Sequence, residues 1–308
     1  MHILSAEQFS PAQIEKIFKR ADYFKKNSST LPGRKKISTI HQGRQLASLF
    51  FQPSTRTRLS FETAAVKLGM GLISTENARE NSSSTKGESI EDTFRILDGY
   101  GYDIIATRHF EVGAAARAAA VCETPIINAG DGKGEHPTQS LLDAYTIYKS
   151  HGRLQGLTVV FGGDLRYGRT VRSLSRILSK YKNNHLIFIS IPELQVNDDI
   201  KGFLASSGTT FEETASVAAA LKKADVVYWT RLQAEYLANP STIPKGFTLN
   251  KRLIKNMKED AIIMHPLPRV DEIDPDVDDD PRAAYFRQAA NGLYVRMALL
   301  DLVLSEKL

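Results

Sequence analysis

The chain has 308 residues, of which 42% are hydrophobic and 24% are charged. These are ordinary values for a globular protein and exclude a disordered or low-complexity chain. The length is comfortable for two domains that share an interface. No apolar run approaches the ~20 residues that a membrane-spanning helix needs, so no such helix is expected.

The net charge is +5 at pH 7, and the single cysteine is Cys122. One cysteine excludes an internal disulfide, and the first residues lack the basic and apolar regions of a signal peptide, so we expect a cytoplasmic protein. A nucleic-acid-binding protein would need aromatic residues interleaved with lysines on one surface. The arginines lie instead beside Gly, Ser and Thr turns. We therefore expect small anionic ligands and neither a nucleic acid nor a membrane as partner.

The first half of the chain alternates between helix and strand patterns. A helix is expected from the N-cap pair Ser10-Pro11 to about residues 27–29, followed by a polar, lysine-rich connector. Strands are expected at four short apolar runs: Leu46–Phe51, Gly71–Thr75, Asp103–Thr107 and Pro125–Asn128. Helices are expected at Arg58–Leu68, Ser89–Leu97, Val112–Val121 and Pro137–Tyr148. This alternation predicts a parallel sheet with helices on both faces.

The alternation starts again after a boundary at residues 151–156. Further strands are expected at Leu157–Phe161, His185–Ser190, Asp225–Thr230 and Ala261–Met264, and a final helix at Ala283–Leu304. The predicted fold class is α/β, with two similar domains that each have a parallel sheet flanked by helices. Ligands of such sheets bind at the carboxyl ends of strands, so the residues after each apolar run are the candidates for function.

The segment after the first strand is a candidate anion site. The hydroxyls of Ser54, Thr55 and Thr57 would lie at the start of a helix, where free N–H groups and the helix dipole attract anions. Arg56 adds a planar fork that suits phosphate oxygens. The alternative is a simple helix cap with two surface arginines, but a cap needs one hydroxyl and no arginine.

Ser-Thr-Arg-Thr-Arg-x-Ser-Phe-Glu after a buried strand resembles the carbamoyl-phosphate loop of the aspartate and ornithine carbamoyltransferases. Other motifs of that family follow in the same order: Arg108-His109, His136-Pro137-Thr138-Gln139, residues 164–170, Thr230-Arg231-Leu232-Gln233 and residues 265–269. The resemblance covers about residues 44–304. It implies a carbamoyl-phosphate domain at residues 1–150, completed by the C-terminal helix 286–308, and an aspartate domain at residues 151–285. The active site would lie in the cleft between them.

The resemblance also implies roles for single residues. Carbamoyl phosphate would be bound by Ser54, Thr55, Arg56, Thr57, Arg108, His136, Gln139, Leu267 and Pro268. The catalytic residues among them would be Thr57, Arg108 and His136, which polarise the carbonyl group, while Gln139 would meet the carbamoyl nitrogen. A helix N-terminus lowers the pKa of a histidine, so we expect His136 to be neutral and able to donate a hydrogen bond.

Arginines after two strands of the second half are expected to bind a dicarboxylic acceptor. Arg169 and Arg231 would each grip a carboxylate through a bidentate fork, with Gln233 beside them. The glycine-rich turn at Asp164 does not fit Gly-x-Gly-x-x-Gly, which argues against a nicotinamide dehydrogenase. Pro266 stands where ornithine enzymes of the family typically have cysteine. Aspartate is therefore the expected acceptor, and another acceptor such as ornithine is the alternative.

The loop at residues 81–88 would be an ordinary surface loop if it stood alone. In the family, a serine and a lysine of this loop reach the neighbouring subunit's active site, and Ser82 and Lys86 are their counterparts here. The resemblance thus implies a homotrimer with shared active sites, and it leaves open a separate regulatory chain. Gln52 departs from the family, which usually has an acidic residue there for domain closure; glutamine can hydrogen-bond but carries no charge.

The expected chemistry needs neither a cofactor nor a metal. The α-amine of aspartate would attack the carbamoyl carbon, and a tetrahedral intermediate would expel phosphate. The product would be N-carbamoyl-L-aspartate, and the resemblance implies an early step of de novo pyrimidine biosynthesis. Catalysis would come chiefly from placing both substrates together and from stabilising oxyanion charge.

Overall fold

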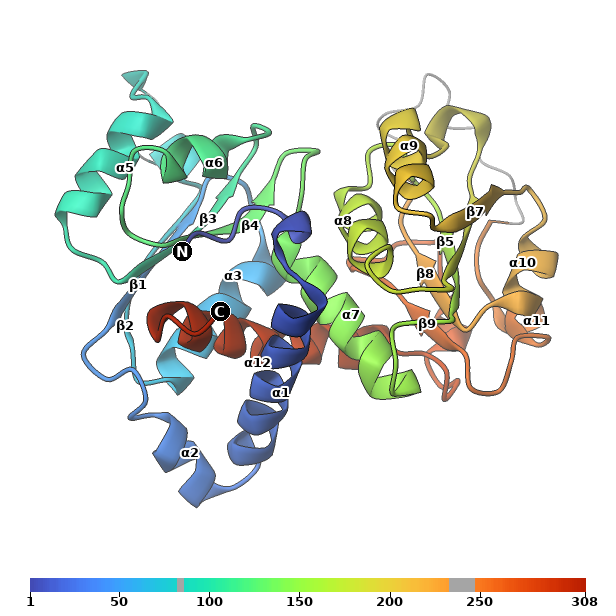
Figure 1. Cartoon of the computed structure of the whole chain (residues 1–308), viewed down its shortest axis with the longest axis horizontal. Coiled ribbons are helices and arrows are strands. Elements are labelled where there is room, and N and C mark those ends of the chain that lie inside the picture. The colour runs from blue at the N-terminus through green and yellow to red at the C-terminus, as the bar shows by residue number, and fades with distance from the viewer. Residues whose placement is uncertain (82–85, 233–246) are drawn as a thin grey trace. The chain divides into compact units, whose positions relative to one another are not determined.

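The computed structural model describes residues 1–81, 86–232 and 247–308. The chain divides into two compact units. Unit 1 consists of Met1–Leu141 and Ala290–Leu308, and unit 2 of Leu142–Ala289. Each unit is built around its own sheet (Figure 1). The chain passes between the units within two helices, α7 (Pro137–His151) and α12 (Tyr285–Leu304).

The sheet of unit 1 is parallel and runs in the order β2-β1-β3-β4. Its strands are β1 (Gln45–Phe50), β2 (Gly71–Glu76), β3 (Ile104–His109) and β4 (Ile126–Asp131). β1 and β3 are central and almost entirely buried, which explains their continuous apolar runs. Phe50 lies opposite Arg108, so β1 and β3 end at the same edge. The strands predicted in this half are confirmed.

Helices cover both faces of this sheet (Figure 1). The helices in the first part of unit 1 are α1 (Pro11–Ser28), α2 (Leu31–Ile37), α3 (Thr55–Lys67), α4 (Ala78–Asn81), α5 (Ile90–Gly99) and α6 (Ala114–Ala119). α3 packs against β1 and β2, and α6 packs against β3 and β4. Phe94 of α5 and Ala115 of α6 share a buried cluster with Ala47 and Ile105 of the sheet. The core of unit 1 therefore sits between the sheet and its covering helices.

The N-terminal helices begin at side-chain caps. Ser10 and Gln13 form a capping box, and α1 begins at Pro11 as predicted. The lysine-rich connector predicted after α1 is wrong, because α2 begins at Leu31. The hydroxyl of Thr30 accepts a hydrogen bond from the N–H of Gly33 at 3.2 Å, which caps this short helix. The run of basic residues concealed that cap in the sequence.

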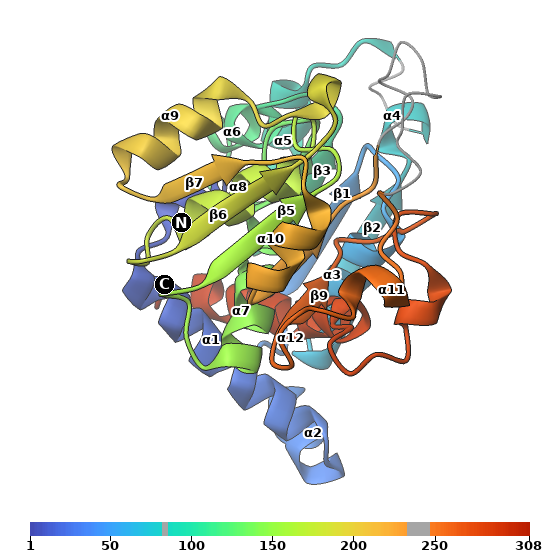
Figure 2. The same ribbon diagram turned by 90° about the vertical axis from the view of Figure 1, so that its right-hand side faces the viewer.

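The sheet of unit 2 is also parallel, in the order β7-β6-β5-β8-β9. Its strands are β5 (Thr158–Gly162), β6 (His185–Ile189), β7 (Thr210–Glu213), β8 (Val226–Trp229) and β9 (Ile262–Met264). Figure 2 shows β7, β6 and β5 side by side. β7 has no counterpart among the predicted strands, because this short edge strand is only half-buried and contains two glutamates. The other strands predicted for this half are confirmed.

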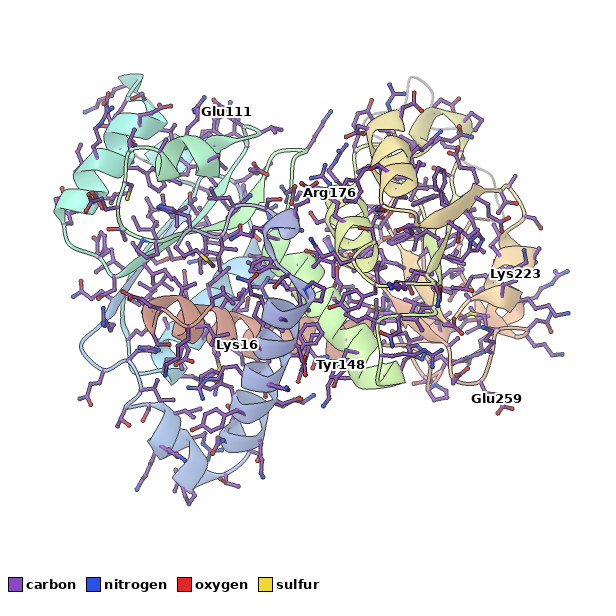
Figure 3. All side chains as sticks on the ribbon, in the orientation of Figure 1. Lys16, Glu111, Tyr148, Arg176, Lys223 and Glu259 are labelled. Atoms are coloured by element: carbon purple, nitrogen blue, oxygen red, sulfur yellow. The ribbon has the colours of Figure 1, made fainter. Side chains whose placement is uncertain are left out.

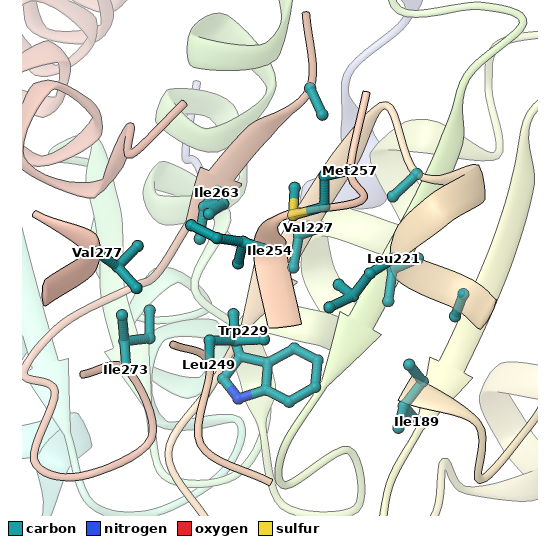
Figure 4. Close-up of a cluster of buried hydrophobic side chains, with 14 of the residues drawn as sticks. Ile189, Leu221, Val227, Trp229, Leu249, Ile254, Met257, Ile263, Ile273 and Val277 are labelled. Carbon is teal, nitrogen blue, oxygen red and sulfur yellow. The ribbon is translucent and has the colours of Figure 1, made fainter. Parts of the chain in front are cut away.

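The core of unit 2 is centred on Trp229, which is fully buried against Phe247 and Leu249 (Figure 4). The helices of unit 2 include α8 (Arg169–Leu178), α9 (Asp198–Ser206), α10 (Val217–Lys223) and α11 (Lys251–Ile254), and α10 and α11 contribute to this core. A Cβ atom on Gly162 would come within 2.1 Å of the Trp229 ring, so close packing requires glycine there. Charged residues such as Lys16 and Lys223 lie at the surface (Figure 3). Within the described ranges, no helix is long and apolar enough to cross a membrane.

Candidate active site

The first candidate segment joins β1 to α3 at the carboxyl edge of the unit 1 sheet. Ser54 is the N-cap residue of α3, but among the described residues its side chain makes no capping hydrogen bond. The hydroxyl of Ser54 therefore does not form the simple helix cap that was the alternative interpretation of this segment. The first N–H groups of α3 have no partner within the helix, which suits an anion. The side-chain oxygen of Gln52 is buried and accepts no hydrogen bond from any described residue.

The two arginines of this segment have different surroundings. Arg58 pairs with Glu62 at 3.3 Å and with Glu76 at 2.8 Å, so it ties α3 to the end of β2. Arg56 is exposed and forms no ion pair within residues 1–81, 86–232 and 247–308. Partial burial lowers the pKa of its guanidinium from the ordinary value, but an arginine stays protonated at neutral pH. Arg56 is thus the cation that is available to a bound anion.

Glu62 holds α3 on the sheet below these arginines. Its Oε1 accepts hydrogen bonds from Ser48 of β1 at 3.2 Å and from Ser74 of β2 at 2.5 Å. Together with the ion pair to Arg58, these contacts fix how the first turn of α3 projects from the sheet.

Thr57 and His136 come together at the same edge. Both are buried, and the hydroxyl of Thr57 lies 3.4 Å from Nε2 of His136. The other ring nitrogen of His136 lies 3.4 Å from the hydroxyl of Thr138. Arg108 is on β3, and its guanidinium lies 3.5 Å from the carbonyl oxygen of Ala129 on β4. The three predicted catalytic residues are therefore carried by neighbouring strands and the segments that follow them.

The glycine-rich loop before His136 is built around Asp131. The carboxylate of Asp131 accepts hydrogen bonds from the N–H of Glu135 at 2.7 Å and of Gly113 at 2.8 Å. Gly132 has a φ of 46°, and a Cβ there would lie 2.5 Å from a backbone oxygen. Glu135 in turn accepts hydrogen bonds from the hydroxyl of Ser5 at 3.0 Å and from the N–H of Ala6 at 2.7 Å. Sequence reasoning did not assign Asp131 and Glu135, which fix the approach to His136.

The remaining unit 1 candidates lie apart from this group or outside the described residues. Gln139 is a partly exposed residue of the first turn of α7. Lys86 is exposed and forms no hydrogen bond or ion pair with any other described residue. Ser82 lies outside the described residues. The structure does not bring Lys86 to the other candidates, and its predicted role in a neighbouring subunit stays a prediction.

In unit 2, Arg169 and Arg231 follow adjacent strands. Arg169 is the first residue of α8, after β5, and Arg231 follows β8. The N–H of Thr230 donates to the carbonyl oxygen of Gly162 at 2.7 Å, which continues the pairing of β5 and β8 beyond the sheet. The N–H of Asp164 donates to the carbonyl oxygen of Arg231 at 3.4 Å. The two arginines are therefore held at one edge of the sheet. Gln233 lies outside the described residues.

Asp164 shapes the turn between β5 and α8. Its buried carboxylate accepts hydrogen bonds from the N–H groups of Arg166 at 3.0 Å and Tyr167 at 2.8 Å. Gly163 has a φ of 112°, and a Cβ there would lie 2.2 Å from the carbonyl oxygen of Thr230. Through these hydrogen bonds Asp164 stabilises the turn that leads to Arg169. A dinucleotide-binding loop would have a glycine at this position.

Leu267 and Pro268 lie beyond the carboxyl end of β9. The N–H of Leu267 donates to Nδ1 of buried His265 at 2.8 Å, and Nε2 of His265 lies 2.7 Å from Glu272. Burial alone would raise the pKa of Glu272, but its hydrogen bonds, the one with His265 foremost, outweigh burial and lower that pKa. His265 thus anchors the backbone whose carbonyl groups are the candidates for ligand contacts.

The predicted site residues therefore form two groups. The group in unit 1 combines hydroxyls, an imidazole and arginines at the edge of one sheet, which suits a phosphorylated ligand with a carbonyl group. The group in unit 2 combines two arginines and a fixed backbone segment, which suits a ligand with two carboxylates. Within the described part of the chain, no cluster of His, Cys, Asp or Glu could hold a metal ion.

The chain matches two domains that are characteristic of one protein family. Residues 1–149 match the carbamoyl-P binding domain of aspartate/ornithine carbamoyltransferase, and residues 155–303 match its Asp/Orn binding domain. The chain is also 48% identical over 306 residues to aspartate carbamoyltransferase 1, chloroplastic, of Pisum sativum. That alignment covers 98% of this chain and 78% of the relative.

Solved structures are similar along nearly the whole chain. The catalytic subunit of M. Jannaschii aspartate transcarbamoylase is 41% identical, with a TM-score of 0.90 and coverage of 99% of this chain and 98% of that one. Aspartate transcarbamoylase from Trypanosoma cruzi in complex with N-(phosphonacetyl)-L-aspartic acid is 37% identical, with a TM-score of 0.90. That match covers 97% of this chain and 94% of the other.

Proposed function

Because the chain belongs to the aspartate/ornithine carbamoyltransferase family, we propose that it transfers the carbamoyl group of carbamoyl phosphate to the α-amine of L-aspartate. The products are N-carbamoyl-L-aspartate and phosphate. The observation that carries this function is the agreement along almost the entire chain with proteins named for aspartate. Pro266 supports the same acceptor, since it replaces the cysteine typical of ornithine enzymes. The reaction is an early step of pyrimidine biosynthesis.

We assign the binding of carbamoyl phosphate chiefly to unit 1. The N-terminus of α3 and Arg56 would hold the phosphate group, together with the hydroxyls of Ser54 and Thr55. Support comes from the exposed, unpaired guanidinium of Arg56 and from the Ser54 hydroxyl, which caps nothing within the described residues. Gln139, Leu267 and Pro268 would complete this half of the site. The carbonyl groups of Leu267 and Pro268 are the acceptors available to an amine or amide N–H.

Polarisation of the carbamoyl group is assigned to Thr57, Arg108 and His136. Donors aimed at a carbonyl oxygen stabilise the negative charge that develops there as the amine attacks. The support is their common position at one sheet edge, with Thr57 in contact with His136. The α-amine would then add to the carbamoyl carbon, and the tetrahedral intermediate would release phosphate. The leaving phosphate would accept the amine proton.

We assign the acceptor to unit 2. Arg169 and Arg231 would each hold one carboxylate of aspartate, and Gln233 would lie beside them. Hydrogen bonds to a charged group contribute about 1.5–3 kcal/mol each, so two bidentate forks suffice to select a dicarboxylic acid. Their positions after the paired strands β5 and β8 support this assignment.

We further propose a homotrimer in which Ser82 and Lys86 serve the active site of a neighbouring copy. Three exposed apolar side chains support an interface on unit 1: Leu59, Val66 and Ile73. They lie on α3 and on the edge strand β2, which pack together. Apolar side chains grouped on adjacent elements commonly mark a surface that another protein covers. Lys86, which no described residue engages, is free to reach such a neighbour.

Native mass spectrometry tests this assembly, and a mass of three chains is the expected result. The same measurement on protein purified from its source reveals whether a separate regulatory chain accompanies the trimer.

We place the enzyme in the cytoplasm, because its only cysteine is buried and unbridged, as in a reducing compartment. Fractionation of cells that express the tagged protein tests that placement.

The activity is tested by offering purified protein carbamoyl phosphate with either aspartate or ornithine. Carbamoyl-aspartate should form with aspartate, and no citrulline should form with ornithine. Citrulline as the main product would assign the ornithine alternative, and no product with either amino acid would contradict the proposed activity.

A further inference from the structure

A fully buried carboxylate lies on α7, close to the first residue of unit 2. Asp143 of α7 has 0% of its surface exposed. Its Oδ2 accepts a hydrogen bond from the hydroxyl of Tyr228 at 2.8 Å, and its Oδ1 accepts one from Nε2 of Gln288 at 2.6 Å. Both partners are buried as well. A carboxylate in the interior is costly unless hydrogen bonds compensate it, so this residue calls for a reason beyond packing.

The hydrogen bonds continue from Asp143 to the end of β9. Gln288 of α12 uses its other amide atom, Oε1, to accept a hydrogen bond from the N–H of His265 at 2.9 Å. The ring of His265 then accepts the N–H of Leu267 at 2.8 Å. A chain of hydrogen bonds therefore links Asp143 to the backbone that is a candidate for substrate contacts.

A second branch runs through Tyr228 to the two arginines. Tyr228 lies on β8, three residues before Arg231. Its hydroxyl is also hydrogen-bonded to the side chain of Thr170, which adjoins Arg169 at the start of α8. Tyr228 thus joins Asp143 to both segments that carry the candidate carboxylate-binding arginines.

We propose that Asp143 is a positioning residue of the active site that acts chiefly on the binding of the acceptor. Its carboxylate fixes the three segments that present Arg169, Arg231 and Leu267. This inference rests on the proposed function of those three residues.

The chemistry of the network explains why a carboxylate is needed. An ionised carboxylate only accepts hydrogen bonds, so Tyr228 must donate to it and Gln288 must turn its NH2 group towards it. The amide oxygen of Gln288 then points at the N–H of His265, as observed. One charge therefore sets the direction of every hydrogen bond as far as β9. A neutral amide at position 143 accepts on one side only, so one of its two neighbours would have to reverse its hydrogen bonds.

The substitution Asp143→Asn tests the network with almost no change in shape. If the oxygen of the new amide faces Tyr228, its NH2 group faces the NH2 group of Gln288. If Gln288 turns over, the mismatch passes to the N–H of His265. If instead the amide oxygen faces Gln288, its NH2 group faces Tyr228, whose hydroxyl must then reverse and donate to Thr170. In each case a hydrogen bond of Asp143 is lost or reversed, and the segments that hold the acceptor shift.

Gln288→Glu provides a rescue. Alone, it places a second carboxylate against Asp143 and should also impair the site, since two like charges oppose each other. Combined as D143N/Q288E, it supplies an acceptor both for the new amide and for the N–H of His265. Every donor is then paired again, with the charge moved from α7 to α12.

Each single variant should raise the KM for aspartate by roughly tenfold to a hundredfold, as expected when positioned groups move by a fraction of an ångström to one ångström. The KM for carbamoyl phosphate should rise less, because only Leu267 and Pro268 of its proposed binding residues lie in a segment that Asp143 fixes. The double variant should regain most of the aspartate affinity. Tyr228→Phe, which removes only a hydroxyl, should cause a smaller rise in the same KM. The Tyr228→Phe variant replaces Asp143→Asn as the test if the Asp143→Asn protein fails to fold.

Asp301→Asn is the matched control. Asp301 is a buried carboxylate of unit 1, paired with Arg20 at 2.6 Å and with His41 at 3.0 Å. Its substitution should lower the melting temperature and leave the ratio of the two KM values unchanged. An equal rise of both KM values in D143N would reduce Asp143 to the same structural role and overturn the proposal.

Two further results would also overturn it: a double variant no better than either single variant, and a normal aspartate KM in both D143N and Y228F. A wild-type protein that forms no carbamoyl-aspartate would instead refute the proposed function. The network would then be judged on thermal unfolding alone. Single variants that melt at lower temperature and a double variant that melts like wild type would support it.

Discussion

The hydroxyl of Thr57 lies 3.4 Å from Nε2 of His136, although 79 positions separate the two residues in the chain. The contact is buried at the carboxyl edge of the unit 1 sheet, where α3 and α7 begin. It brings a hydroxyl and an imidazole together beside the strand that carries Arg108. The arrangement fits donors that stabilise one developing oxyanion.

Thr57→Val removes the hydroxyl with little change in volume. We expect kcat to fall about a hundredfold, as for the loss of one donor to a developing oxyanion, with an unchanged melting temperature. Thr57→Ser keeps the hydroxyl and should retain most of the activity. Steady-state kinetics of both variants make the test, and equal losses in the two would exclude the hydroxyl as the important group.

Arg56 and Arg58 form a matched pair for the phosphate site. Arg56→Ala should raise the KM for carbamoyl phosphate by roughly 10- to 100-fold at unchanged stability, because a charge-assisted hydrogen bond contributes about 1.5–3 kcal/mol. Arg58→Ala should instead lower the free energy of unfolding by about 1–3 kcal/mol, because Glu62 and Glu76 lose their cation. Kinetics and urea unfolding of both variants would show the contrast. Identical behaviour would mean that the two arginines have been assigned wrongly.

Arg231→Ala should act on the acceptor alone. The KM for aspartate should rise by roughly tenfold or more, while the KM for carbamoyl phosphate stays nearly constant. Arg166, an exposed neighbour of the same turn, provides the control, and Arg166→Ala should leave both constants within about twofold. Wild-type kinetics in the Arg231 variant would remove this residue from the site.

Asp98 gives a prediction for acid stability. Hydrogen bonds from the backbone and side chain of Thr124 lower the pKa of Asp98 from 3.8 to about 2. Because the folded-state pKa is depressed, these bonds stabilise the fold above the ordinary pKa, and the contribution disappears as the pH falls from about 4 towards 2. Asp98→Asn should therefore be less stable than wild type at pH 6, with a difference that shrinks at lower pH. Urea unfolding of both proteins across that pH range makes the test. A difference in the free energy of unfolding that grows in acid would contradict the prediction.

Much of the fold could be predicted because buried parallel strands leave continuous apolar runs. The apolar run Leu46–Phe51 predicted β1, and the hydroxyl residues that follow this run predicted the start of α3. α2 was missed because its cap, Thr30, stands before a basic segment that resembles a connector. β7 was missed because an exposed edge strand has no such run. Both omissions are peripheral to the candidate residues.

The candidate site was predictable only in part. The motif residues themselves could be named because their motifs resemble those of a known family, and several of them directly follow a predicted strand. The residues that hold them could not, because a local pattern carries no information about partners far along the chain. Gln288 meets Asp143 from 145 positions away, and Glu135 meets Ser5 from 130 positions away. Such pairs become visible only in three dimensions.

The most direct test of the account is a crystal structure of the protein with N-(phosphonacetyl)-L-aspartate. We expect the phosphonate to lie at the N-terminus of α3 in contact with Arg56, His136 to approach the carbonyl oxygen, and Arg169 and Arg231 to hold the carboxylates. A ligand bound elsewhere, with these side chains turned away from it, would contradict the account.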